Sequence, residues 1–129
     1  MRILVDTQCW LWMLSAPERF SDDSRKLVEA IENELYLSAA SAWEIAIKYQ
    51  LGKLQLPSRP AELIPELMSK TTVVALPIRH SHGLRVAELP PHHSDPFDRL
   101  LVAQAQLEGL PLLTADPQFE PYDVEVLRA

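Results

Sequence analysis

The stretch DPFDRLLVAQAQLEGLPLLTAD, residues 95–116, decides the fold of this 129-residue chain. Its first half has apolar residues at helical spacing and begins with an acid followed by proline, as helices often do. Gly109 tolerates the left-handed conformation that ends a helix, and the apolar run at 112–114 predicts a buried strand. The stretch therefore predicts a helix over 95–108 that leads directly into a strand, the repeating unit of an α/β fold.

The same alternation continues on both sides of this stretch. Helices are predicted over residues 7–14, 21–33, 39–51, 60–69 and 80–89, the last interrupted at Gly83. Strands are predicted over residues 3–5, 35–38, 72–76 and 124–127. Because helices connect successive strands, we expect an α/β sandwich with a mainly parallel central sheet of four to five strands.

Length and composition limit the classes of protein and site. The chain suits a single domain over residues 1–129, and its 47% hydrophobic and 23% charged residues are typical of a globular protein. The three glycines lie far apart, which excludes glycine-rich nucleotide-binding loops. Asp6 interrupts the apolar N-terminus, which excludes a membrane span or signal peptide there. With one cysteine and no internal disulfide, we expect a cytoplasmic protein.

Four acidic residues stand where strands end or where the next helix begins. They are Asp6, Glu44, Asp98 and Asp116. In open α/β sheets, ligands bind at the carboxyl ends of the strands, so these side chains are expected to converge there. Converging carboxylates repel one another unless a cation lies between them, and oxygen ligands favour Mg²⁺ or Mn²⁺. The pattern predicts a divalent-metal site, and phosphoryl transfer is the reaction class that such a site favours.

Each acid also has a structural interpretation. Asp95 is the expected N-cap of its helix and a secondary candidate for a metal ligand. Glu44 fits a capping box that begins at Ser41, and it also forms an i,i+4 pair with Lys48. Asp116 followed by proline is typical of a turn. The shared location of the four acids, rather than any one of them, favours the metal site.

Four motifs in order carry a resemblance to a known family. They are VDTQCWLW near the start, LSAASAWEIAIKYQLGKL in the middle, and HHSDPFDRLLVAQA and LLTADPQF near the end. Together they resemble the PIN-domain ribonucleases, specifically the VapC-type toxins of bacterial toxin–antitoxin systems. The resemblance covers nearly the whole chain.

This resemblance implies a PIN-like α/β/α sandwich and a Mg²⁺- or Mn²⁺-dependent endoribonuclease with an RNA substrate. It also implies a homodimer and a cognate antitoxin that silences the site. The family's metal-binding acids fall on Asp6, Glu44, Asp98 and Asp116, and Thr114 would hydrogen-bond within the site. Four apolar residues, Trp10, Leu11, Met13 and Leu14, are candidates to line an antitoxin groove or to pack in the core.

The net charge of −6 argues against a nucleic-acid-binding protein, unless metal ions offset the clustered acids. Five basic residues are spaced to flank the acidic site and to hold RNA phosphates, or to lie on a solvated surface. They are Lys48, Lys53, Arg79, Arg85 and Arg99. The four histidines have no spacing typical of zinc sites and are expected in loops. Cys9 lies in an apolar helix that disfavours a thiolate nucleophile.

Two other functions remain open. A Mg²⁺-dependent phosphatase with an aspartyl-phosphate would usually have a second acid two residues after Asp6, where the chain has Gln8. A non-catalytic PIN-like module could use the same acidic pocket to recognise a basic partner segment.

Overall fold

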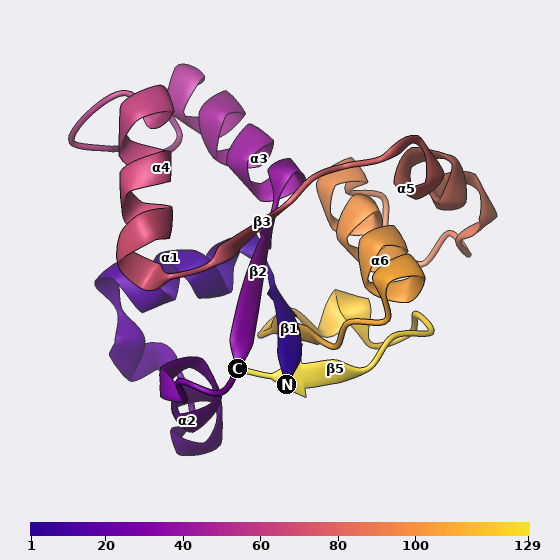
Figure 1. Cartoon of the computed structure of the whole chain (residues 1–129). Coiled ribbons are helices and arrows are strands. Elements are labelled where there is room, and N and C mark those ends of the chain that lie inside the picture. Colours follow the sequence, from indigo (N-terminus) through magenta and orange to yellow (C-terminus); the bar gives the residue numbers. More distant parts are fainter.

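A five-stranded parallel sheet forms the centre of the computed structural model, which describes residues 1–129 (Figure 1). The strand order is β3–β2–β1–β4–β5, and every neighbouring pair is parallel. The strands are β1 Arg2–Val5, β2 Glu34–Ser38, β3 Val74–Leu76, β4 Leu112–Thr114 and β5 Val126–Arg128. This arrangement confirms the predicted α/β sandwich and its number of strands.

Helices cover both faces of the sheet. They are α1 Thr7–Ser15, α2 Asp22–Glu29, α3 Ala39–Gln50, α4 Pro60–Thr71, α5 His80–Arg85 and α6 Pro96–Glu108. In Figure 1, α1 to α4 lie on one side of the strands, and α5 and α6 lie on the other. None of these helices is long and apolar enough to span a lipid bilayer.

Alternate residues of β1 pack into two separate hydrophobic cores. Ile3 and Val5 belong to a buried cluster that includes side chains of α1, α3 and α4. Leu4 points the other way, into a cluster with Leu101 and Val102 of α6. All three strand residues are fully buried, as expected for a parallel strand covered on both faces. The sheet therefore holds its strand ends rigidly between two packed layers.

The ends of α6 follow the sequence prediction. The Asp95 side chain accepts hydrogen bonds from the backbone N–H groups of Phe97 and Asp98, as an N-cap does. Gly109 ends the helix with a φ of 65°, in the left-handed region that favours glycine.

Several predicted boundaries were wrong. The N-cap of α3 is Ser38, whose hydroxyl accepts from the Ala40 N–H, so the predicted capping box at Ser41 does not exist. Gly83 lies inside α5 without interrupting it, and the change to a 3₁₀ turn comes at Val86–Glu88. Thr72, predicted in a strand, instead ends α4 with a φ of 54°.

Candidate metal centre

A cavity of about 600 Å³ opens at the carboxyl ends of β1 and β4. All four acids predicted for the metal site line it, and so does Asp95. Asp6 follows β1 directly, Asp116 lies two residues beyond β4, and Glu44 and Asp98 project from α3 and α6. The fold therefore gathers acids from four distant parts of the chain around one space, as the strand-end rule predicts.

Both carboxylate oxygens of Asp6 accept hydrogen bonds. One of its oxygens, Oδ1, accepts from the Cys9 N–H at 2.7 Å, so Asp6 is also the N-cap of α1. The other, Oδ2, accepts from the Thr114 hydroxyl, which in turn accepts from the Asp116 N–H at 3.0 Å. Burial raises the pKa of Asp6, and the bonds from Thr114 and Cys9 oppose that change. Thr114 thus links β4 to the acid at the end of β1.

Glu44 lies on the α3 side of the cavity and is nearly buried. Its Oε1 is 2.8 Å from the Thr7 hydroxyl, and its Oε2 is 2.7 Å from the Lys48 ammonium. The same Thr7 oxygen is 2.8 Å from the Ser41 hydroxyl, so Thr7 donates to the carboxylate and accepts from Ser41. The hydrogen bond that Lys48 donates to Glu44 raises the pKa of Lys48, which therefore stays charged.

Asp98 lies on the α6 side, with its Oδ2 at 2.7 Å from the ring Nε2 of His93. Burial raises the pKa of Asp98 to about 6, the His93 bond opposes the rise, and the charge of Asp95 adds to it. His93, Asp98 and Asp116 each offer a ligand atom within 4.8 Å of the others. Asp6 and Glu44 line the same cavity but lie outside this tight group.

A divalent cation fits this set of donors. Most of the donors are carboxylate oxygens, the ligands that Mg²⁺ and Mn²⁺ prefer. Burial raises the pKa of both Asp6 and Asp98, so their negative charges are incompletely balanced by the protein. Among these acids, only Glu44 forms an ion pair with a lysine, which is Lys48. A cation between Asp98 and Asp116 would offset that excess charge.

Comparison with known proteins identifies the family. The family model of the PIN domain matches residues 3–125. This chain belongs to the PIN-domain family. Ribonuclease VapC16 of Mycobacterium tuberculosis is 43% identical to it over 61 residues, which are 47% of this chain and 43% of that protein. The match thus spans less than half the length of that curated relative.

Solved structures share the fold of this PIN domain along its whole length. VapBC2 from Rickettsia felis, bound to a DNA fragment from its promoter, superposes with a TM-score of 0.73 at 14% identity. The match covers 99% of this chain and 98% of that chain. DNA-bound VapBC from Salmonella typhimurium gives a TM-score of 0.69 at 16% identity, with 99% and 98% of the two chains covered. At these identities the likeness shows the fold.

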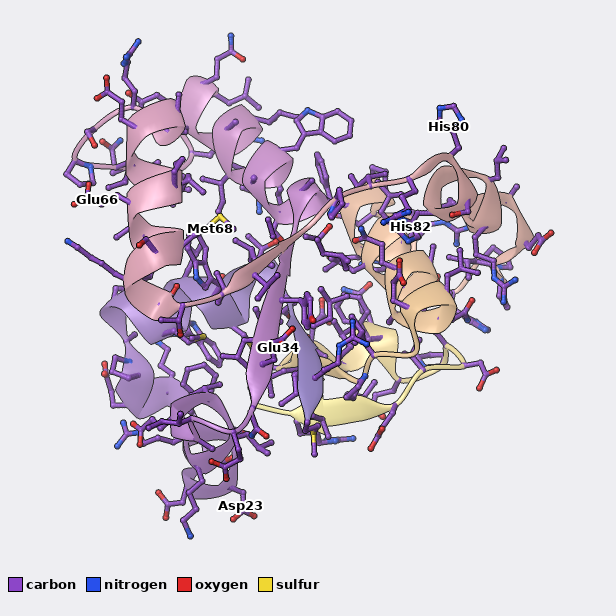
Figure 2. The ribbon with its side chains drawn as sticks, in the orientation of Figure 1. Asp23, Glu34, Glu66, Met68, His80 and His82 are labelled. Atoms are coloured by element: carbon purple, nitrogen blue, oxygen red, sulfur yellow. The ribbon has the colours of Figure 1, made fainter.

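The histidine in the cavity was missed by the sequence analysis. His93 lies in a loop, as expected from the sequence, but its ring was given no role at the site; its exposed neighbour His92 packs instead against the Tyr122 ring. The position of His93, five residues before Asp98, was the available signal. However, the adjacent pair of histidines does not tell which ring turns inward. The other two histidines lie on α5, where His80 points outward and His82 turns toward α6 (Figure 2).

Only two of the five predicted phosphate-binding residues lie at the cavity of this PIN domain, namely Lys48 and Lys53. The Arg99 guanidinium instead donates to backbone carbonyls, among them those of Val86 and Pro90. Arg85 bonds to Gln106 near the other end of α6. Arg79 lies at the start of α5 and does not line the cavity. These three arginines therefore do not line the cavity, and for Arg99 the reason is its hydrogen bonds to the backbone, which charge and spacing do not reveal.

The apolar residues predicted to line a partner groove lie in different places. Leu11 lines the cavity, whereas Trp10 is fully buried and donates from its indole N–H to the Thr71 hydroxyl at 3.1 Å. Met13 and Leu14 pack against the core below α1. Cys9 is fully buried, and burial raises the pKa of its thiol, in keeping with the prediction that it is not a nucleophile.

Proposed function

We propose that this PIN domain, residues 1–129, is a Mg²⁺- or Mn²⁺-dependent endoribonuclease and the toxin of a type II toxin–antitoxin module. The observation that carries the proposal is the gathering of Asp6, Glu44, Asp98 and Asp116 around one cavity at the strand ends. Membership of the PIN family and the partial match to a VapC ribonuclease support RNA as the substrate.

The residues at the cavity have different roles in the proposed reaction. Asp6, Asp98 and Asp116 would hold the metal, and Glu44 would face it from α3. A bound ion would activate water and stabilise the charge that develops on the phosphodiester. Thr114 fixes the orientation of the Asp6 carboxylate by its hydroxyl bond. Lys48 and Lys53, at the cavity, would contact RNA phosphates without reading sequence.

The chemistry of the cavity also supports a protein partner. Two of the solved structures with this fold are VapBC structures, and we propose that a cognate antitoxin binds and silences this chain. A pocket that already accepts the ammonium of Lys48 beside Glu44 suits a cationic side chain from such a partner. We also propose that the chain acts as a homodimer.

The experiment that tests the nuclease compares wild-type protein with Asp6→Asn and Asp98→Asn on purified RNA, in Mg²⁺ or Mn²⁺ and with chelator. Asp23→Asn is the matched control, since Asp23 lies on α2, far from the cavity (Figure 2). We expect the site variants to lose at least about 100-fold in cleavage rate. The chelator should abolish cleavage by wild type and by the control.

Equal RNA degradation by wild type and both site variants would contradict the proposal, because the cleavage would then come from a contaminant. The same proteins separate the other two functions. Metal-dependent hydrolysis of a small phosphate monoester without RNA cleavage would favour the phosphatase. Binding of a basic peptide, lost in Asp98→Asn and without any hydrolysis, would favour the non-catalytic module.

A further inference from the structure

The loop that precedes α6 brings a histidine ring to the metal cavity. His93 lies in this loop, and its side chain is only 11% exposed. The ring Nε2 is 2.7 Å from Asp98 Oδ2, a distance typical of a hydrogen bond to a charged acceptor. None of the roles in the proposed nuclease reaction uses this ring.

The backbone of His93 is fastened from two directions. Its N–H donates to the Tyr122 hydroxyl at 2.9 Å, and its carbonyl accepts from the Arg99 guanidinium at 3.3 Å. Arg99 also donates to the carbonyls of Val86 and Pro90 and to Tyr122 Oη. One guanidinium on α6 thus ties the whole preceding loop to the helix that carries Asp98. The backbone that carries the His93 ring is therefore held at the edge of the cavity.

The contact with His93 uses only one of the two oxygens of the Asp98 carboxylate. An ionised carboxylate only accepts hydrogen bonds, so Nε2 carries the proton and donates to Oδ2. Oδ1 receives no hydrogen bond from the protein and remains free to coordinate. Nearby, Asp116 contributes a ligand atom within 4.8 Å of those of His93 and Asp98. The ring therefore fixes which oxygen of Asp98 is open.

We propose that His93 is a positioning residue for the metal site: its ring N–H holds Asp98 Oδ2 and leaves Oδ1 free for a divalent cation, which Asp116 would also help to hold. This role rests on the proposed metal dependence. It adds to the site a residue that lies in the loop before α6 and acts through Asp98. Hydrogen-bonded partners of metal-binding carboxylates commonly change metal affinity by about 10- to 100-fold.

Two substitutions separate the hydrogen bond from the shape of the ring. His93→Phe keeps a flat ring against Phe119, whose ring centroid lies 6.4 Å away, but it has no donor. His93→Gln loses the ring but offers an amide N–H to Asp98. His93→Leu is a second variant without a donor, in case His93→Phe does not fold. His80→Phe is the matched control, because His80 is exposed on α5 and points outward (Figure 2).

The measurement is Mn²⁺ binding to the full chain without RNA, by calorimetry and by the spectroscopic signal of free Mn²⁺. Thermal unfolding of the metal-free proteins checks that each variant is folded. We expect His93→Phe and His93→Leu to bind Mn²⁺ about 10-fold or more weakly, and His93→Gln to stay within about threefold of wild type. The control should bind as wild type does.

Three results would overturn the role of His93: a folded His93→Phe that binds Mn²⁺ as wild type does, a His93→Gln as weak as His93→Phe, or a wild type that binds no Mn²⁺. A wild type whose Mn²⁺ affinity depends on His93 but which cuts no RNA would support the positioning role. That last result would contradict the nuclease proposal alone.

Discussion

At the scale of a single residue, the burial of Asp98 makes the stability of the protein depend on pH. Its folded-state pKa of about 6 lies above the ordinary value of 3.8, and desolvation is the main cause. Between these two values the folded, metal-free protein binds more protons than the unfolded chain does. The free energy of unfolding therefore falls as the pH rises through this window, and it levels off above it.

The prediction is a difference between wild type and Asp98→Asn in metal-free buffer. The free energy of unfolding of Asp98→Asn, relative to that of wild type, should rise from pH 4 to above pH 6 by on the order of 2 kcal/mol, because the substituted amide stays neutral throughout. Denaturant unfolding at a series of pH values measures this difference. A difference that does not depend on pH would show that the Asp98 carboxyl titrates normally.

The four acids could be found from the sequence because each is fixed by its distance from a strand end or a helix start. The roles of His93 and Arg99 could not be found in this way. Whether a loop histidine turns inward depends on how the loop folds back, and that depends on Arg99 reaching the carbonyls of Val86 and Pro90. Such bonds join a side chain to backbone groups, which every residue carries and no motif records.

At the scale of elements, the glycines show the difference between residue type and conformation. Gly83 and Gly109 both have open space where a Cβ would stand. Gly83 lies inside α5 with ordinary helical backbone, whereas Gly109 has a φ of 65°. An added methyl group therefore meets no clash at either site, but at Gly109 it is strained by the backbone.

We therefore expect opposite effects from the same substitution. Gly83→Ala should stabilise the protein by about 0.4–1 kcal/mol, because the unfolded chain loses freedom and the helix gains propensity. Gly109→Ala should destabilise it by about 1 kcal/mol, because alanine disfavours the left-handed region. Chemical denaturation measures both changes. Stabilisation by Gly109→Ala would contradict the assigned end of α6.

The elements themselves were largely predictable, and their boundaries were less so. Buried strands such as β1 and β4 show as apolar runs, and α6 shows both its cap and its terminal glycine. The start of α3 was misplaced because Ser38 and Ser41 are both plausible caps. Only the hydrogen bonds distinguish them: Ser38 accepts from the Ala40 N–H, while Ser41 contacts Thr7.

At the scale of the whole molecule, the acidic cavity makes stability depend on ions. The carboxylates come from separate elements, so a cation held by Asp6, Asp98 and Asp116 would cross-link α6 to the ends of β1 and β4. We expect Mn²⁺ at about 100 times its dissociation constant to stabilise the protein by about 2.7 kcal/mol. Thermal unfolding with and without Mn²⁺ measures this effect.

Asp98→Asn should show almost no response to Mn²⁺, and the control Asp23→Asn should respond as wild type does. An equal rise in the unfolding midpoint of wild type and Asp98→Asn would place the ion elsewhere on the surface. The prediction does not depend on RNA cleavage, so it tests the metal centre separately from the nuclease.

The buried thiol between α1 and the sheet offers a probe of how often α1 separates from the sheet. Cys9 is fully enclosed, and it is the only sulfhydryl in the chain. An alkylating reagent can reach it only when α1 leaves the strands, so in the folded protein the rate of labelling reports how often that separation occurs. The rate of Cys9 alkylation thus measures this large-scale fluctuation without a fluorescent dye.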